Sequence, residues 1–490
     1  MTPPSVASTV HAGCIDPAGG SRVLCVDLDG TLVATDLLWE SLMSALRSRP
    51  WAVLALPYWL SKGRAHLKRR LAEISAVDFA SLPYKPGTLR AVGEAFRLGR
   101  HTVLATASDR ILADGVSNHL GIFREVLASD GVTNLKGHTK AAILVKRYGS
   151  GNFDYIGDSP ADVPCWAEAA DAITVGVVPV QKVPHLRELT PADAEGGSPG
   201  RLRMLVRALR PHQWLKNLLL AVPAIGAHEL GVSTLLEIAL AFVSLSLVAS
   251  GGYVLNDLLD LAADRRHPRK KGRPFASGSL SLLTGVTVIG LTWVVGFGIA
   301  ALTLPAAFAW LVLVYLVGTA AYSISLKRVA VLDVLFLAGL YVIRVVGGGL
   351  ATGVPVSTWL LAVTLFVCLS LAFLKRFIEV RAKGGEPSAA VLGRGYQADD
   401  AIWLQSAGLS TAYIAVLVLA LYVNNPDVMR LYAHPERLLF LCPVVLYGAT
   451  RVWLEAHRGK VHDDPLVAVA MDPVTYVLAS IAAAVALTAI

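Results

Sequence analysis

The pattern of hydrophobic residues divides the chain into two regions. Up to about residue 200, apolar and polar residues mix over short stretches, as in an ordinary globular protein. From Trp214 onward, long apolar runs are separated by short polar breaks, and a helix needs about 20 apolar residues to cross a bilayer. About nine such runs are present, at 214–229, 234–255, 280–302, 305–324, 330–352, 357–374, 402–423, 437–454 and 467–490. The pattern predicts a soluble region followed by about nine membrane-spanning helices.

The same pattern predicts where each region begins and ends. Residues 1–21 have no apolar stretch of the kind found in a signal peptide, and we expect them to form a disordered tail. We expect a globular domain over 22–185 and a membrane domain over 201–490. Residues 186–200 are polar and end in the glycine- and proline-containing sequence ADAEGGSPG, which is typical of a flexible linker.

Composition and charge agree with a membrane protein. Hydrophobic residues make up 54% of the chain and charged residues only 16%, which is unusual for a soluble protein. The net charge of +8 would suit a nucleic-acid partner, but the basic residues of the apolar region gather in alternate loops. They stand at Arg201, Arg203, Arg207, Arg210 and Lys216, from Arg265 to Arg273, at Lys327 and Arg328, and at Lys375, Arg376, Arg381 and Lys383. This positive-inside pattern predicts an inner-membrane protein whose soluble domain and basic loops are cytoplasmic, with no nucleic-acid partner. With nine spans, the C-terminus would lie outside.

The soluble region begins with an apolar strand that ends in two carboxylates. In RVLCVDLDGTLVATD, Asp27 and Asp29 are two residues apart, so on a strand both side chains point to the same side. Gly30 and Thr31 then permit a tight turn. One carboxylate can attack phosphorus while the other protonates the leaving oxygen and later activates water.

Three further pieces suited to phosphate chemistry follow in order. The strand in HTVLATASDR ends in the hydroxyls of Thr106 and Ser108. Lys140 stands at an expected helix start in LKGHTKAAIL, where it can neutralise phosphate charge. The strand in FDYIGDSPADV ends in Asp158, with Asp162 four residues later, and such carboxylates suit Mg²⁺.

These four pieces, in this order, resemble the haloacid dehalogenase (HAD) superfamily of phosphohydrolases over about residues 22–180. The resemblance implies a parallel α/β sheet with a cap domain over about 36–100. It implies catalytic and Mg²⁺-binding roles for the following residues: Asp27 as nucleophile, Asp29 as acid and base, Thr106 and Lys140 as phosphoryl-binding groups, Asp27, Asp158 and the Asp29 carbonyl as metal ligands, and Asp162 as a supporting carboxylate. The alternative is a degenerate domain that is kept for structure alone.

The expected cap contains an apolar segment, PWAVLALPYWLS, that is too short to span a membrane. Basic residues flank it, at Arg49, Lys62, Arg64, Lys68, Arg69 and Arg70. This combination is typical of a segment on a membrane surface, and an ordinary cap core with a solvated basic face explains it equally well.

The membrane region carries its richest polar cluster after the second apolar run. In GGYVLNDLLDLAADRRHPRKKGRP, Asn256, Asp257, Asp260 and Asp264 have spacings that place them along one side of a helix. Carboxylates arranged in this way suit Mg²⁺ that bridges a diphosphate. The basic run that follows can pair with phosphates, although a solvated positive loop is the alternative.

This motif resembles the UbiA prenyltransferase superfamily, whose members have nine spans and a cavity open to the cytoplasm. The resemblance implies that the N-D-x-x-D-x-x-x-D helix binds Mg²⁺ and a diphosphate donor. A second aspartate-rich motif is expected after the sixth span, but this chain has FLKRFIEVRAKGGEPSAAVLGRGY there, with Lys375, Arg376 and Glu379. The departure favours a different donor or acceptor.

That departure, with RPHQWLKN at 210–217 and the stretch at 321–360, resembles the decaprenyl-phosphate 5-phosphoribosyltransferases over nearly all of 201–490. The resemblance implies 5-phosphoribosyl 1-diphosphate as donor and a polyprenyl phosphate as acceptor. Glu379 or Asp333 is the expected group for stabilising positive charge at the anomeric carbon. The candidates for binding substrate are Lys216, Arg265, Lys270, Arg273, Lys327, Arg344, Lys375, Arg376 and Tyr396.

The sequence therefore predicts a bifunctional enzyme that transfers phosphoribosyl to a lipid phosphate and then removes the 5-phosphate. Two alternatives remain open. One is a prenyltransferase that uses a prenyl diphosphate and an aromatic or lipid acceptor. The other is a transporter with a docked regulatory domain. Oligomeric state does not follow from the sequence.

Overall fold

The computed structural model describes residues 22–176, 186–189, 200–382, 395–423, 425, 432–461 and 465–489. The chain forms two compact units. The first, called here the N-terminal unit, combines Met1–Leu205 with Asp257–Gly285, and the second, called the membrane unit, combines Val206–Asn256 with Val286–Ile490. The polar segment after the second apolar run therefore groups with the soluble domain, whereas the sequence had placed it within the membrane domain.

The N-terminal unit is built on a sheet of six parallel strands. The strands are β1 (Val23–Val26), β2 (Thr102–Asp109), β3 (Glu125–Ser129), β4 (Phe153–Gly157), β5 (Asp171–Thr174) and β6 (Leu186–Glu188). Their order in the sheet is β3-β2-β1-β4-β5-β6. Because β6 pairs with β5, the domain extends past the expected boundary at residue 185, and the start of the expected linker is wrong.

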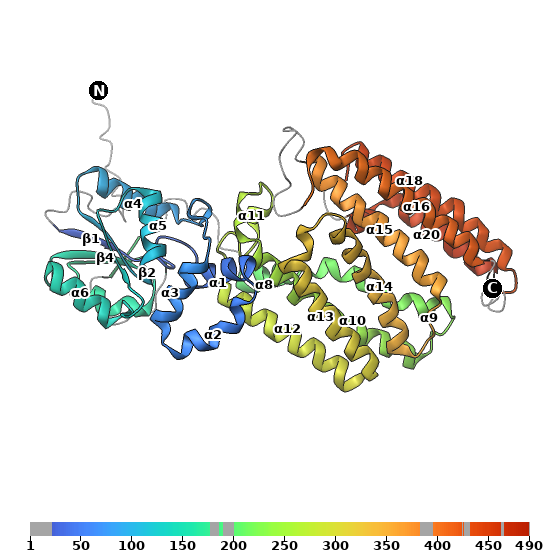
Figure 1. Cartoon of the computed structure of the whole chain (residues 1–490), viewed down its shortest axis with the longest axis horizontal. Helices are drawn as coiled ribbons and strands as arrows, with labels where there is room; N and C mark the ends of the chain where they lie inside the picture. Colours follow the sequence, from blue (N-terminus) through green and yellow to red (C-terminus); the bar gives the residue numbers. More distant parts are fainter. Residues whose placement is uncertain are drawn as a thin grey trace, which may run out of the picture. The chain divides into compact units, whose positions relative to one another are not determined.

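Helices cover both faces of this sheet, as the alternation of its side chains requires (Figure 1). On one face, Leu24 and Val26 pack in a cluster that includes Val92 of α4 (Pro86–Arg97). On the other face, Cys25 packs with residues of α6 (His138–Tyr148), among them Leu144. The two remaining core helices are α5 (Arg110–Leu120) and α7 (Val163–Glu168), with a 3₁₀ turn, η2, at Pro160–Asp162.

The cap is a set of short helices between β1 and α4. It comprises α1 (Leu37–Ser48), α2 (Ala52–Ser61), α3 (Arg64–Ile74) and the 3₁₀ turn η1 (Phe79–Ser81). Helix α1 begins where the side chain of Asp36 accepts a hydrogen bond from the Leu38 amide at 2.8 Å. The expected cap at 36–100 is too long, because α4 packs on the sheet and belongs to the core.

The rest of the N-terminal unit follows the second apolar run. It contains α11 (Leu261–Arg266) and the 3₁₀ turn η4 (Lys270–Gly272), and α8 (Arg201–Leu209) crosses the boundary between the units. The expected continuous helix through the aspartates is wrong: α10 (Val232–Leu259) ends at Leu259, and Asp260 separates it from α11.

The membrane unit is entirely helical in its described residues. Its further helices are α9 (Val222–Gly226), α12 (Leu282–Thr303), α13 (Ala306–Ile324), α14 (Leu332–Thr352), α15 (Thr358–Arg381), α16 (Ala401–Val423), α18 (Leu441–His457), α19 (Pro465–Met471) and α20 (Pro473–Ala489). Its 3₁₀ segments are η3 (Pro211–Ala221), η5 (Leu326–Arg328), η6 (Ala398–Asp400) and η7 (Pro435–Phe440).

Seven helices in the described part of the chain are long and apolar enough to cross a membrane. The two other expected spans differ from the prediction. Residues 214–229 form the end of η3 and the short α9, and 467–490 hold the end of α19 and the 17-residue α20. The predicted fold class, a HAD-like sheet followed by a polytopic helical domain, is confirmed, whereas nine spans are not.

Candidate active sites

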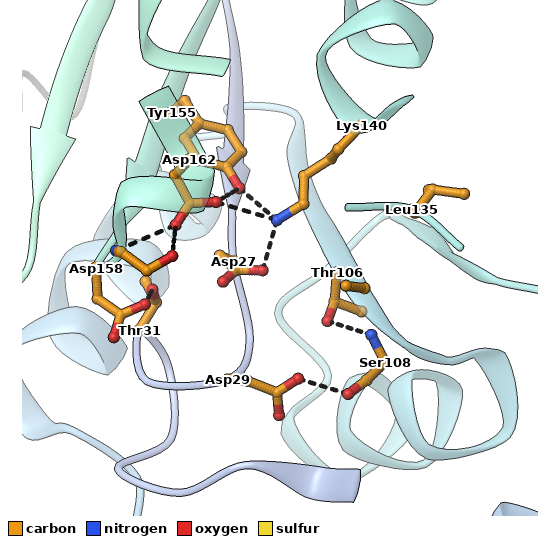
Figure 2. Close-up of polar contacts among 12 residues, drawn as sticks. Asp27, Asp29, Thr31, Thr106, Ser108, Leu135, Lys140, Tyr155, Asp158 and Asp162 are labelled. Carbon is orange, nitrogen blue, oxygen red and sulfur yellow. Dashed lines mark hydrogen bonds and ion pairs between the residues drawn. The ribbon is translucent and has the colours of Figure 1, made fainter. Parts of the chain in front are cut away.

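The sheet order brings the four expected phosphate-binding pieces to one edge. Strand β1 lies between β2 and β4, so the winding of the chain reverses beside it. In sheets of this kind, ligands bind beyond the carboxyl ends of the strands at that reversal. Asp27 follows β1, Thr106 lies on β2, Asp158 follows β4 and Lys140 lies in the first turn of α6 (Figure 2).

Lys140 is the centre of a buried hydrogen-bond network. Its Nζ donates to Asp27 Oδ1 at 2.8 Å, to the Tyr155 hydroxyl at 2.7 Å and to Asp162 Oδ1 at 3.2 Å (Figure 2). The Tyr155 hydroxyl also donates to Asp162 Oδ1 at 2.8 Å. Burial opposes the ammonium charge, but the carboxylates of Asp27 and Asp162 outweigh it and raise the pKa of Lys140. Lys140 therefore remains a cation beside the expected nucleophile.

Asp29 lies on the same loop as Asp27 and has different partners. Its Oδ2 accepts from the Ser108 hydroxyl at 2.5 Å, and its Oδ1 accepts from the Leu37 amide at 2.8 Å, where α1 begins. Thr106 accepts from the Ser108 amide at 3.0 Å through Oγ1. Asp29 is thus held between strand β2 and the cap, in a position apart from the Lys140 network.

The two carboxyl groups of the loop are both shifted toward their neutral form. Burial raises the pKa of Asp27 to about 6, against the opposing effect of Lys140. Burial and the nearby Asp36 raise the pKa of Asp29 to about 7. A carboxyl group with a pKa near neutrality can both give and take a proton, which suits the expected acid and base.

The residues at the strand ends also fit a hard divalent cation. Asp27, Asp158 and Asp162 each offer an oxygen within 4.8 Å of the others, and in the part of the chain that the structure describes no other group of three acidic, histidine or cysteine residues does so. Asp158 also accepts from Thr31 Oγ1 at 3.1 Å. An all-oxygen set of this kind is what Mg²⁺ prefers. Asp162 is already engaged by Lys140, Tyr155 and Ser159, which favours the supporting role expected for it.

The aspartates after the second apolar run converge on an arginine. Arg273 Nη1 donates to Asp257 Oδ1 at 3.0 Å and to Asp264 Oδ2 at 2.6 Å, so one cationic group already bridges the two carboxylates. Asp260 lies at the break between α10 and α11, and its Oδ1 is 4.0 Å from Arg47 Nη1. In the described part of the chain, these three aspartates do not bring three carboxylate oxygens within 4.8 Å of one another. Lys270 begins η4 and is half-buried.

Several of the expected basic residues lie inside the membrane unit. Arg344 is buried, and it donates to Asn217 Oδ1 and to the Tyr315 hydroxyl, both at 2.8 Å. Both Arg344 and Lys216 lie over the ring of Tyr341, at 5.3 and 5.7 Å from its centroid. A pair of buried cations is a suitable place for an anionic group.

Two more expected residues bond to neighbours at or beside the helix ends. Lys327 of η5 donates to Asn256 Oδ1 at 2.9 Å, and Asn256 directly precedes Asp257 on α10. Lys375 lies on α15, half-buried, one residue before Arg376.

The last group of expected residues forms a closed network. Arg376 pairs with both Asp333 and Glu379, and it donates to the Tyr322 hydroxyl at 2.9 Å. The Tyr396 hydroxyl donates to Asp333 Oδ1 at 2.6 Å. Asp333 and Arg376 are almost completely enclosed. This arrangement favours a positioning role for Asp333 and Arg376, and leaves Glu379 as the more accessible member.

Reasoning from sequence missed three residues of the phosphate site. Tyr155 lies within a strand, where an aromatic residue predicts core packing. Lys68 of α3 donates to the Ala107 carbonyl at 2.5 Å and to Asn134 Oδ1 at 3.1 Å, and Lys85 donates to the Gly30 carbonyl. Both lysines come from the cap region, whose approach to the sheet no local pattern indicates.

Comparison with known proteins identifies both domains. The profile of the UbiA prenyltransferase family matches residues 217–471, and that of haloacid dehalogenase-like hydrolases matches residues 24–167. The uncharacterised protein y4nM of Sinorhizobium fredii is 35% identical over 467 residues, which cover 94% of this chain and 89% of that protein.

Two further relatives each match about half of the chain. Nodulation protein NoeC of Azorhizobium caulinodans is 36% identical over 259 residues, covering 53% of this chain and 84% of that protein. The decaprenyl-phosphate phosphoribosyltransferase of Mycobacterium tuberculosis is 32% identical over 231 residues, covering 46% of this chain and 74% of that protein. The expected resemblances are confirmed. The chain therefore belongs to the UbiA prenyltransferase family, as a multi-pass membrane enzyme that also carries a haloacid dehalogenase-like hydrolase domain.

Proposed function

We propose that the membrane domain transfers a 5-phosphoribosyl group from 5-phosphoribosyl 1-diphosphate to a polyprenyl phosphate, and that the HAD-like domain removes the 5-phosphate of the product. The likeness to a decaprenyl-phosphate phosphoribosyltransferase carries the first step. The assembled Asp27, Asp29, Lys140 and Asp158 site supports the second. Both sites would face the cytoplasm, because the basic loops lie on that side under the positive-inside pattern.

The donor's diphosphate would bind where Asp257, Asp264 and Arg273 meet. Asp257 and Asp264 would hold Mg²⁺, which when bound offsets the charge of the leaving diphosphate. Arg273, which bridges these carboxylates in the structure, supplies a guanidinium for the phosphate oxygens. Asn256 directly precedes Asp257 on α10, and we propose it as a further ligand. We place Arg265 outside this set, because Glu40 occupies its guanidinium.

The acceptor's phosphate would bind at buried cations of the membrane unit. Lys216 and Arg344 lie around Tyr341 and offer two positive charges. A phosphate oxygen of the acceptor attacks the anomeric carbon, the bond to the diphosphate oxygen breaks, and diphosphate leaves with the electron pair. Glu379, held by Arg376, can stabilise the positive charge that develops on the ribose.

In the HAD-like domain, the Asp27 carboxylate attacks the 5-phosphate and forms an aspartyl-phosphate. The phosphorus–oxygen bond to the ribose breaks, and Asp29 gives its proton to the leaving oxygen. Asp29 then takes a proton from water, which attacks the aspartyl-phosphate and releases inorganic phosphate. Lys140, beside Asp27, offsets the charge on the phosphoryl group. Mg²⁺ at Asp27 and Asp158 would supply further charge neutralisation.

Incubating the full-length protein with Mg²⁺, labelled phosphoribosyl diphosphate and a polyprenyl phosphate tests the proposal. We expect label in the lipid, release of inorganic phosphate and accumulation of polyprenyl-phosphoryl ribose. Asp27→Asn should instead accumulate the 5-phosphorylated lipid, and mass spectrometry separates the two products by one phosphate. Transfer of a prenyl group from a prenyl diphosphate, with no use of phosphoribosyl diphosphate, would contradict the proposal.

A further inference from the structure

Helix α2 of the cap exposes an unusual number of apolar side chains. It contains no charged residue, and several of its large side chains, with that of Trp51 directly before it, are exposed, while Leu56 and Trp59 are half-buried. The exposed fractions are 82% for Leu54, 60% for Trp51, 59% for Tyr58, 52% for Leu60 and 47% for Val53. Exposed apolar side chains in this number, on one short helix, mark a place where another apolar surface binds. The exposure of Leu54, Tyr58 and Leu60 argues against the interpretation of this segment as ordinary cap core.

Basic residues surround this apolar helix. No aspartate or glutamate stands between Glu40 and Glu73. Arg49 precedes α2, Lys62 and Arg64 follow it, and all three are exposed. An apolar face with basic flanks matches a surface that is apolar inside and anionic at its rim, which is the chemistry of a bilayer with acidic headgroups.

A contact of α1 places α2 close to a membrane span. Arg47, in the last turn of α1, donates from Nη1 to the Leu259 carbonyl at 3.4 Å. Leu259 is the last residue of α10, one of the helices able to cross a membrane. Helix α2 begins at Ala52, and a chain this short reaches at most about 18 Å. The exposed apolar helix therefore starts near the residue at which α10 ends, within the same compact unit.

A buried ion pair fixes α1 in this position. Arg265 Nη2 lies 2.5 Å from Glu40 Oε1, and Arg265 Nη1 lies 3.2 Å from Glu40 Oε2. Glu40 also accepts from Thr35 Oγ1 at 2.9 Å, and Arg265 donates to the Ala276 carbonyl at 3.0 Å. Both charged side chains are more than nine-tenths buried. A two-point arginine–carboxylate pair constrains direction as well as distance, so α1 cannot rotate freely on the segment after α10.

We infer that α2 inserts into the headgroup layer of the membrane and holds the phosphatase site at the lipid surface. Helix α1 links the two, because the Leu37 amide at its start binds Asp29 and its last turn leads into α2. The inference that the substrate is a lipid-linked phosphate rests on the proposed function. The contact between α2 and the membrane does not depend on it.

Spin labelling of the full-length protein tests the membrane contact. Nitroxides are attached to Leu54→Cys and, as a control, to Leu98→Cys, with Cys14 and Cys442 replaced by serine. Leu98 is 61% exposed at the end of α4, away from the active-site edge. In vesicles of phosphatidylcholine with phosphatidylglycerol, the label at position 54 should collide more with oxygen than with a water-soluble nickel chelate, and the label at position 98 should do the reverse.

Two outcomes of that experiment would overturn the inference. The label at position 54 could be as accessible to nickel as the control, which means that α2 faces water. It could instead show dipolar broadening from a second label, which means that α2 binds another copy of the chain. Reversing the charges of Lys62 and Arg64 with glutamate should reduce insertion in phosphatidylglycerol vesicles and change it little in pure phosphatidylcholine.

An activity measurement separates this inference from the proposed function. Leu54→Glu should slow hydrolysis of a phosphomonoester on a vesicle-embedded lipid by at least about tenfold. It should leave hydrolysis of a water-soluble phosphomonoester unchanged, and Leu98→Glu should leave both rates unchanged. An equal loss on both substrates would contradict the role of α2 at the surface. A wild-type protein that hydrolyses neither would contradict the proposed phosphatase step, while the spin labels still decide the membrane contact.

Discussion

At the scale of single residues, the phosphatase site depends on how closely two loops approach each other. Gly30 has a φ of +77°, and a Cβ at this position would stand 2.0 Å from Asp158 Oδ2. The loop after β1 can therefore pass over Asp158 only with glycine at this position. This close approach brings the loop that carries Asp27 and Asp29 next to Asp158, as the proposed cation site requires.

We expect Gly30→Ala to lower phosphatase activity by at least about 100-fold, because the methyl group displaces Asp158 by an ångström or more. Mg²⁺ affinity, measured by calorimetry, should fall with it, while lipid labelling by the transferase remains. Gly99→Ala is the control, since Gly99 also has a positive φ of +84° but open space around it. Both variants should lose about 1–2 kcal/mol of stability from the left-handed backbone. Equal activity in the two would show that the close approach is unimportant.

At the scale of helices and strands, the sequence predicts the features that follow from local pattern and misses those that depend on tertiary contacts. The strand ends that carry Asp27 and Asp158 follow from apolar runs bounded by turn residues, and their meeting follows from the parallel topology. No proline or glycine beside Asp260 indicates the break between α10 and α11. The break lies beside two contacts with the cap, which is distant in sequence: Arg47 with Asp260 and Glu40 with Arg265. Tertiary pairs of this kind override helical periodicity, so a pattern of spacings could not reveal the break.

Helix packing in the membrane unit depends on one glycine of α14. A Cβ on Gly348 would stand 2.0 Å from the Leu220 carbonyl oxygen of η3, whereas a Cβ on Gly339 of the same helix would meet nothing within 4 Å. We expect Gly348→Ala to destabilise the protein by about 1–3 kcal/mol, because backbone must shift to admit the methyl group. Gly339→Ala should leave stability unchanged or raise it slightly. Thermal unfolding of the two variants in the same detergent compares them, and equal midpoints would contradict the close packing.

The carboxylates at the end of α10 give a second prediction at this scale. Asp257→Asn should reduce lipid labelling by at least about 100-fold, since it removes charge where the donor's diphosphate would bind. Glu237→Gln is the matched control, because Glu237 lies toward the opposite end of the same helix. Hydrolysis of a water-soluble phosphomonoester by the HAD-like domain should be unchanged in both. Full transfer activity in Asp257→Asn would remove this residue from the proposed donor site.

At the scale of the whole molecule, the question is why the two proposed activities would share one chain. The segment Asp257–Gly285, which carries the proposed donor-binding aspartates, belongs to the same compact unit as the phosphatase domain. The buried Glu40–Arg265 pair holds the cap on that segment. A lipid-linked product has a further constraint, since it diffuses in two dimensions and reaches only a phosphatase at the membrane surface. A phosphatase on the same chain therefore meets each new product at a high effective concentration.

This coupling predicts a difference between one chain with two activities and two chains with one each. Asp27→Asn retains the proposed transferase, and Asp257→Asn retains the proposed phosphatase. An equimolar mixture of the two in the same vesicles contains both activities, but every product must travel between chains. We expect the mixture to accumulate the 5-phosphorylated lipid before phosphate appears. The wild type at half that total concentration, which matches the number of each active site, should show little of this intermediate.

Diluting the mixture with added lipid should lengthen the lag before phosphate appears, because the mean distance between chains grows, and it should leave the wild type unaffected. Quenched time points analysed by mass spectrometry measure both species. Identical time courses would mean that the intermediate is released and recaptured freely, so that fusion of the two domains brings no kinetic advantage.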